Sequence, residues 1–155
     1  MRVYLVIMDE TEEAGKALRF ASRRAFAASG TVHILALVTP QNFNAFGGVQ
    51  ATIEQEARDR AEVLAMSAAG NLFDESGKMP TIAVREGTGQ AVIREYLEEH
   101  PEVAALVLGA ADDSNPGPLV SHFSGVSGRL QCPLFIVPGA LSEEEVDRLS
   151  VPDNE

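Results

Sequence analysis

Five short apolar segments alternate with longer, more polar segments along the chain. The apolar segments cover residues 2–8, 31–38, 81–85, 103–108 and 134–137. Their Val, Ile, Leu and Ala runs are nearly continuous, which is typical of strands that are buried on both faces of a parallel sheet. The pattern therefore predicts five strands joined by four connections.

Helical spacing of apolar residues marks the first two connections. The polar residues Asp9, Glu10 and Thr11 can cap a helix that begins after the first strand. Residues 39–48 form a loop rich in Asn, Gln and Gly, and a second helix follows, with a turn at residues 74–78 after it. The apolar faces of the two helices consist of Ala14, Leu18, Ala21 and Ala25 in the first, and Ile53, Ala57, Ala61, Leu64 and Ala68 in the second.

The third and fourth connections are shorter. A tight turn at residues 86–89 leads into a helix that ends before Pro101. Its apolar stripe consists of Val92, Ile93, Tyr96 and Leu97. The fourth connection starts with a Gly- and Pro-rich turn at residues 110–120 and continues as a helix, for which Ser121 is the expected N-cap. Strands that alternate with helices in this way predict an α/β domain with a doubly wound parallel sheet.

Length and charge narrow the class of protein. At 155 residues the chain is expected to form one domain over residues 1–140, followed by an acidic tail, 141–155, that is solvated and partly helical or frayed. The net charge is −11, of which the tail carries −5. A nucleic-acid-binding surface needs a basic stripe, and the sequence shows none. No apolar run reaches the ~20 residues that a membrane span requires, so no membrane partner is expected.

Candidate reactive residues are few. The single cysteine, Cys132, fits a reducing cytoplasm and is expected to be a buried, unreactive thiol. His33 lies within a strand and His100 at a helix end, and neither has a metal-ligand partner at usable sequence spacing. The sequence contains no nucleophile elbow and no Gly-Lys-Ser/Thr phosphate loop. We therefore expect no metal site and no efficient enzyme.

Three stretches of the sequence resemble the universal stress protein family. These are LVIMDETEEAGKALRFA at residues 5–21, VREGTGQAVIREYLEE at residues 84–99, and LVLGAADD with PLVSHFSGVSGRLQCPLFIVPG at residues 106–113 and 118–139. The resemblance covers about residues 2–138. It implies a sheet in the order 3-2-1-4-5, as in adenine-nucleotide alpha-hydrolase-like folds. It also implies a cytoplasmic role in stress response and a homodimer that forms through the last strand.

One branch of that family binds ATP through a glycine signature. The signature has a glycine, two residues, a second glycine, nine residues, and then Gly-Ser or Gly-Thr. Here Gly109 matches the first glycine, and Asp112 stands where the second would be. Counted back from Cys132 and Pro133, the final pair falls on Val120 and Ser121, so Ser121 matches and Val120 replaces the third glycine. Gly117 lies inside the loop and can restore some of its flexibility. The match is partial, and the ligand that the signature implies is ATP or another adenine nucleotide.

The loop before the fourth helix supports two interpretations. A helix N-terminus attracts phosphate, and Mg²⁺ could bridge phosphates to Asp112 and Asp113. Alternatively, the two aspartates repel phosphate, and the loop is a solvated turn. Asp9 likewise either contacts the adenine or ribose, as the resemblance implies, or caps the first helix together with Thr11. The candidate nucleotide-binding residues are Asp9, Thr11, Leu37, Gly109, Asp112, Gly117, Ser121 and His122.

These observations predict a binding or regulatory module that works without turnover. The first alternative is an ATP-binding switch, with at most slow hydrolysis, that uses residues 109–121 and Mg²⁺. The second is a dimeric interaction protein whose crevice is empty or filled by side chains. Pairing of the last strand with a second copy would cover its unpaired backbone groups.

Overall fold

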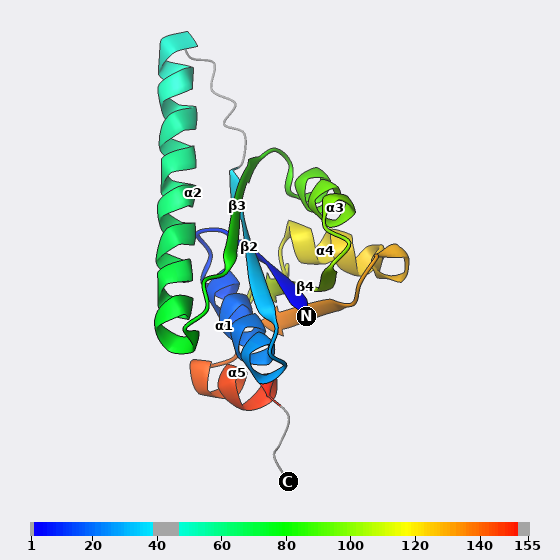
Figure 1. Ribbon diagram of the computed structural model, residues 1–155. Helices are drawn as coiled ribbons and strands as arrows, with labels where there is room; N and C mark the ends of the chain where they lie inside the picture. The colour runs from blue at the N-terminus through cyan, green and yellow to red at the C-terminus, as the bar shows by residue number, and fades with distance from the viewer. Residues whose placement is uncertain (1, 39–46, 152–155) are drawn as a thin grey trace.

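The computed structural model describes residues 2–38 and 47–151 (Figure 1). Its five strands form one parallel sheet in the order β3-β2-β1-β4-β5, which confirms the predicted topology. The strands occupy the predicted segments to within two residues: β1 Val3–Met8, β2 Thr31–Val38, β3 Thr81–Glu86, β4 Val103–Ala110 and β5 Leu134–Pro138.

Helices cover both faces of the sheet. One face is covered by α1 Glu12–Ala27, α2 Gly47–Ser76 and α5 Glu143–Ser150. The other face is covered by α3 Gly89–Glu99 and α4 Pro118–Gly125, which is followed by the short 3₁₀ turn Ser127–Arg129. The crossovers therefore lie on opposite faces of the sheet, as in a doubly wound fold.

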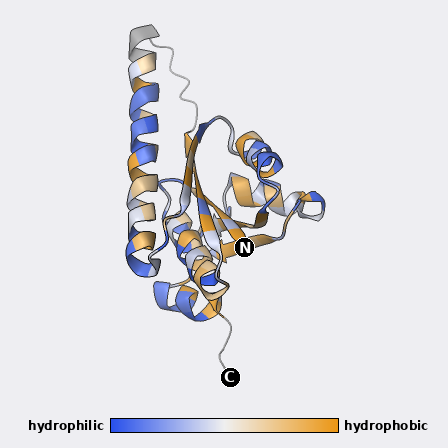
Figure 2. Cartoon of the chain, viewed as in Figure 1, coloured by the Kyte–Doolittle hydropathy of each residue, from blue (hydrophilic) through white to orange (hydrophobic). Residues whose placement is uncertain are grey.

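Alternate residues of the strands point into two separate hydrophobic cores, one on each face of the sheet. In β1, Val6 packs with α1, α2 and α5, whereas Leu5 and Ile7 pack with α3 and α4. Because successive strand residues point to opposite faces, a strand covered on both sides must be apolar throughout. Figure 2 shows this distribution, with hydrophobic residues along the strands and hydrophilic residues over much of α2.

The second helix is longer than the sequence predicted. Of the predicted loop 39–48, residues 39–46 lie outside the described part of the chain, whereas Gly47 and Gly48 are helical. At the other end, α2 continues through residues 74–76, which were predicted to form a turn. The helix ends at Ser76 because the next residue, Gly77, adopts a φ of 73°, a left-handed conformation that ends helices.

The acidic tail is partly built into the domain, which corrects the expectation of a solvated end. A capping box between Ser142 and Glu145 starts α5. Val146 and Ser150 are fully buried where this helix packs on α1. Asp147 accepts two hydrogen bonds from Arg19, at 2.6 Å from Nε and 2.7 Å from Nη2. The helical part of the prediction is confirmed.

Candidate functional site

The predicted site residues gather at the carboxyl edge of the sheet. Asp9 follows β1, Leu37 lies near the end of β2, and Gly109 lies near the end of β4. Strands β1 and β4 are neighbours, and the helices that follow them, α1 and α4, cover opposite faces. This is the switch point of the sheet, where open α/β folds bind ligands.

Gly109 is fixed by packing against α1. A Cβ atom added at this position would lie 2.2 Å from the backbone oxygen of Glu13. Gly139, after β5, is also tightly enclosed, since its Cβ would lie 2.5 Å from the oxygen of Ala110. Gly109 therefore allows β4 and α1 to approach closely, and Gly139 allows the chain after β5 to lie close to the end of β4. This packing explains Gly109 without a ligand.

Internal hydrogen bonds occupy much of the loop between β4 and α4. The amide of Ala111 donates to the oxygen of Pro116 at 3.0 Å, and the amide of Gly117 donates to Asn115 Oδ1 at 3.0 Å. The amide of Ser114 donates to Asp113 Oδ1 at 2.6 Å. An amide that already has a partner is not free to bind phosphate, so the loop lacks three of the donors that a phosphate cradle needs. Asp112 is exposed on this loop.

The fourth helix begins earlier than predicted, so Ser121 is not its N-cap. Gly117 occupies the cap with a φ of 108°, and Pro118 is the first helical residue. Proline favours this position because its fixed φ suits a helix start and it lacks an amide proton that would need a partner. Ser121 is exposed within the helix, and its amide donates to the oxygen of Gly117 at 3.0 Å.

Asp9 and Thr11 form the cap of α1. The amide of Thr11 donates to Asp9 Oδ1 at 2.9 Å, and the Thr11 hydroxyl donates to the same oxygen. Thr11 Oγ1 accepts from the amide of Ala14 at 3.3 Å. The capping interpretation of these residues therefore has direct support, although Asp9 remains at the edge of the crevice.

Two leucines lie against Gly89 at the carboxyl edge of the sheet. A Cβ added at Gly89, the first residue of α3, would lie 2.7 Å from Leu119 Cδ2 and 3.3 Å from Leu37 Cδ1. Both leucines pack against the core beneath α3 and α4. Leu119 was not among the predicted site residues, although the Gly117-Pro118 pair, a common helix start, would have placed it in the first turn of α4.

On the other side of Leu37, the described residues bound a cavity of about 160 Å³. This is smaller than the roughly 300–1,000 Å³ of typical ligand pockets. Its polar lining consists of Asp9, Glu10 and Arg60, and Arg60 Nε lies 3.4 Å from a carboxylate oxygen of Glu10. The cationic side chain that lines this cavity, Arg60, therefore already has a carboxylate partner.

His122 lies in the middle of α4 rather than at a helix start. Its ring contacts Phe123 edge-on with 4.9 Å between the ring centres. Its Nε2 atom is buried and has no hydrogen-bond partner within the described residues. The structure gives His122 a packing contact and does not place it at the head of an anion-binding helix.

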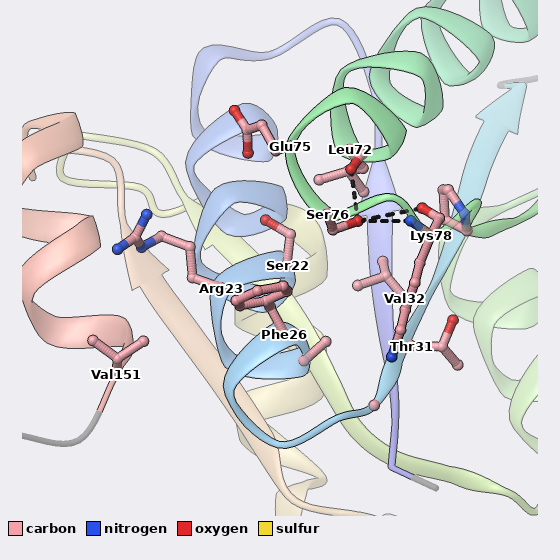
Figure 3. Close-up of a pocket in the computed structure, with 13 residues that line it drawn as sticks. Ser22, Arg23, Phe26, Thr31, Val32, Leu72, Glu75, Ser76, Lys78 and Val151 are labelled. Carbon is pink, nitrogen blue, oxygen red and sulfur yellow. Dashed lines mark hydrogen bonds between the residues drawn. The ribbon is translucent and has the colours of Figure 1, made fainter. Parts of the chain in front are cut away.

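Other hollows of the described structure lie away from all eight predicted residues, and two of them border α1 and α2. A groove of about 580 Å³ runs between α1, α2 and the start of α5. A cavity of about 240 Å³ lies between the carboxyl ends of α1 and α2 and the start of β2 (Figure 3). Inside it, the Ser76 hydroxyl donates to the oxygen of Leu72 at 2.7 Å and accepts from the amide of Lys78 at 3.2 Å. These polar groups satisfy one another.

In the described part of the chain, no helix is both long enough and apolar enough to cross a membrane.

Comparisons with known proteins agree with this architecture. The sequence model of the universal stress protein family matches residues 1–138. Among solved structures, the universal stress protein UspA from Lactobacillus plantarum is similar to this chain with a TM-score of 0.74 at 19% identity, over 88% of this chain and 97% of that one. No curated protein sequence matches the chain.

Two similar structures contain adenine nucleotides. A universal stress protein from Archaeoglobus fulgidus, in complex with dAMP, has a TM-score of 0.59 at 16% identity and covers 88% of this chain and 97% of its own. A universal stress protein family protein from Arabidopsis thaliana, with AMP bound, has a TM-score of 0.59 at 13% identity and covers 89% and 92%. At such identities the likeness concerns the fold alone.

Proposed function

The chain belongs to the universal stress protein family, and from that premise we propose that it is a cytoplasmic stress-response module that acts by binding and not by turnover. We further propose that its inherited nucleotide crevice is closed. The observation that carries this proposal is that Leu119 and Leu37 both lie against Gly89, where an added Cβ would be 2.7 Å and 3.3 Å from them. A nucleotide bound between Asp9, Leu37 and residues 109–121 would have to displace these side chains.

Charge at this edge of the sheet supports the same proposal. Asp9 and Glu10 follow β1, and Asp112 and Asp113 follow β4. The nearby cations Arg60 and Lys16 already have partners, since Arg60 Nε lies 3.4 Å from a carboxylate oxygen of Glu10 and Lys16 Nζ donates to the backbone oxygen of Gly139. A triphosphate would meet like charge here unless a divalent cation bridged it to the carboxylates.

The second candidate is an adenine-nucleotide switch with at most slow hydrolysis. It is favoured by the dAMP and AMP complexes of similar structures. In this case Leu119 would turn aside, Asp9 and Leu37 would contact the nucleoside, and Mg²⁺ would join the phosphates to Asp112. Calorimetric titration with Mg·ATP separates the two candidates. The closed crevice predicts no heat of binding up to millimolar nucleotide, and saturable binding would establish the switch.

We also propose that the protein is a homodimer. Strand β5 lies at the edge of the sheet, and Ile136 on it is 40% exposed. Pairing two copies of β5 would satisfy the outward backbone groups of the strand and cover the side chain of Ile136. Light scattering should give a dimeric mass at micromolar concentration. Ile136→Lys should shift the protein toward the monomer, and a monomeric mass for the unaltered protein would refute the proposal.

A further inference from the structure

Three metal-ligating side chains converge at the amino edge of the sheet, opposite the nucleotide crevice. His33 is the third residue of β2, His100 directly follows α3, and Glu102 directly precedes β4. One candidate ligand atom from each lies within 4.8 Å of the other two. Sequence spacing alone could not reveal a partner for either histidine, because the three residues come from separate elements.

Tyr96 orients both histidine rings. Its hydroxyl lies 2.9 Å from His33 Nδ1, so Nε2 of the same ring remains available as a ligand. Its ring stacks on His100 with 4.2 Å between centres and 26° between planes. The two imidazoles meet nearly at right angles, with 5.6 Å between their centres. Metal-binding histidines are commonly fixed in this way, by a hydrogen bond to the ring nitrogen that does not bind the metal.

We propose that His33, His100 and Glu102 form a binding site for a divalent transition-metal ion of the Zn²⁺ type. Two imidazole nitrogens and one carboxylate oxygen are a known three-ligand set for Zn²⁺, with water at the fourth position. Zn–N and Zn–O distances of about 2.0–2.2 Å place the ligands of a tetrahedral ion about 3.3–3.5 Å apart. The observed spread of up to 4.8 Å requires only a small movement.

Two of the three proposed ligands, His100 and Glu102, are able to make that movement. The side chain of Glu102 is 48% exposed and that of His100 is 29% exposed. At present His100 Nδ1 lies 2.8 Å from Glu102 Oε1, so the pair shares a hydrogen bond that the metal would replace. His33 is buried and provides the fixed point of the site.

The surroundings suit a cation. Burial, and then the proximity of His100, lower the pKa of His33, which favours the neutral imidazole that metals require. The nearby cation Arg85 is paired, since its Nη2 lies 3.6 Å from a carboxylate oxygen of Glu99. The site lies at the opposite edge from the crevice, so the proposal does not depend on the proposed function.

The test is a calorimetric titration of the full chain with Zn²⁺, repeated with Co²⁺ while visible absorption is recorded. We expect one Zn²⁺ per chain and the visible bands of Co²⁺ with nitrogen and oxygen ligands, without an intense thiolate band in the near ultraviolet. His100→Ala and Glu102→Gln should each weaken binding by at least about tenfold. Because both side chains are partly exposed, these variants should fold, which circular dichroism will check.

The control is His122→Ala, which removes the remaining histidine, in α4. This variant should bind Zn²⁺ with unchanged affinity. The proposal would be overturned by absence of saturable binding with one ion per chain, by unchanged affinity in both His100→Ala and Glu102→Gln, or by loss of binding in His122→Ala. A thiolate band would also overturn it, because it would assign the ion to Cys132.

Discussion

Leu119 in α4 reaches Gly89 at the start of α3 so closely that an added Cβ would lie 2.7 Å from its Cδ2 atom. The contact joins the two helices that cover one face of the sheet, at the edge where the fold places ligands. Gly89 leaves room for the leucine, and the leucine fills the space that Gly89 leaves. This relationship, more than any missing signature residue, supports a closed crevice.

Truncation of Leu119 tests whether this contact is part of the core. Leu119→Ala should lower the free energy of unfolding by about 2 kcal/mol, because it removes a partly buried side chain and leaves a cavity. Urea unfolding measures the change. An effect no larger than about 0.5 kcal/mol, the usual size at surface positions, would mean that the leucine does not fill the crevice in solution.

Alanine substitutions at Gly109 and Gly70 provide a matched test of close backbone packing. Gly109→Ala should destabilise the protein by about 1–3 kcal/mol, because the new Cβ would meet the backbone of Glu13 at 2.2 Å. Gly70→Ala, inside α2 with nothing within 4 Å of its Cβ, should stabilise it by up to about 1 kcal/mol. The melting temperatures of the two variants should therefore shift in opposite directions from that of the unaltered protein. A tolerated Gly109→Ala would contradict close packing of β4 on α1.

The acidic carboxyl-terminal helix should contribute to the stability of the whole domain. Val146 is fully buried against α1, so Val146→Ala should cost about 2 kcal/mol. Leu149 lies on the same helix but is 49% exposed, and Leu149→Ala should cost well under about 1 kcal/mol. Equal effects in guanidinium unfolding would show that α5 does not dock on α1.

The ion pair between α1 and α5 should make this docking sensitive to acid. The hydrogen bond from Arg19 holds the pKa of Asp147 below its ordinary value of 3.8. A lowered carboxyl pKa adds stability that is complete above the ordinary value and is lost as the pH falls through the folded-state value. Asp147→Asn should therefore cost about 1 kcal/mol at neutral pH, and the difference from the unaltered protein should shrink below about pH 4.

Unfolding free energies measured from pH 3 to pH 7 check this prediction. Glu95→Gln, which removes one exposed carboxylate from α3 on the other face of the sheet, is the control for charge alone. A pH dependence that is the same in Asp147→Asn and Glu95→Gln would contradict the assigned role of the pair.

The sequence predicted the strands well because burial on both faces leaves a continuous apolar signal. It predicted the ends of α2 poorly. Gly47 and Gly48 are weak helix formers, and only the folded chain shows them to be helical. The docking of α5 depends on one apolar residue, Val146, and on Arg19, which lies 128 positions from Asp147 along the chain. A local pattern cannot reveal such a contact.

The candidate site likewise has parts that the sequence predicts and parts that it does not. Residues at strand ends, such as Asp9 and Gly109, could be placed from the element order, because parallel strands bring their carboxyl ends to one edge. The approach of Leu119 to Gly89 could not, since it depends on where α4 starts. Nor could the convergence of His33, His100 and Glu102, which depends on how α3 and β4 lie beside β2.

The most direct test of the closed crevice is a thermal melt with and without millimolar Mg·ATP. It compares the unaltered protein with Asp112→Gly and with Asp112→Gly combined with Leu119→Ala. Any ligand of the native state must raise the melting temperature. We expect no shift in the unaltered protein and a shift only when the aspartate and the leucine have both been replaced. A shift in the unaltered protein would contradict it and would establish an adenine-nucleotide switch.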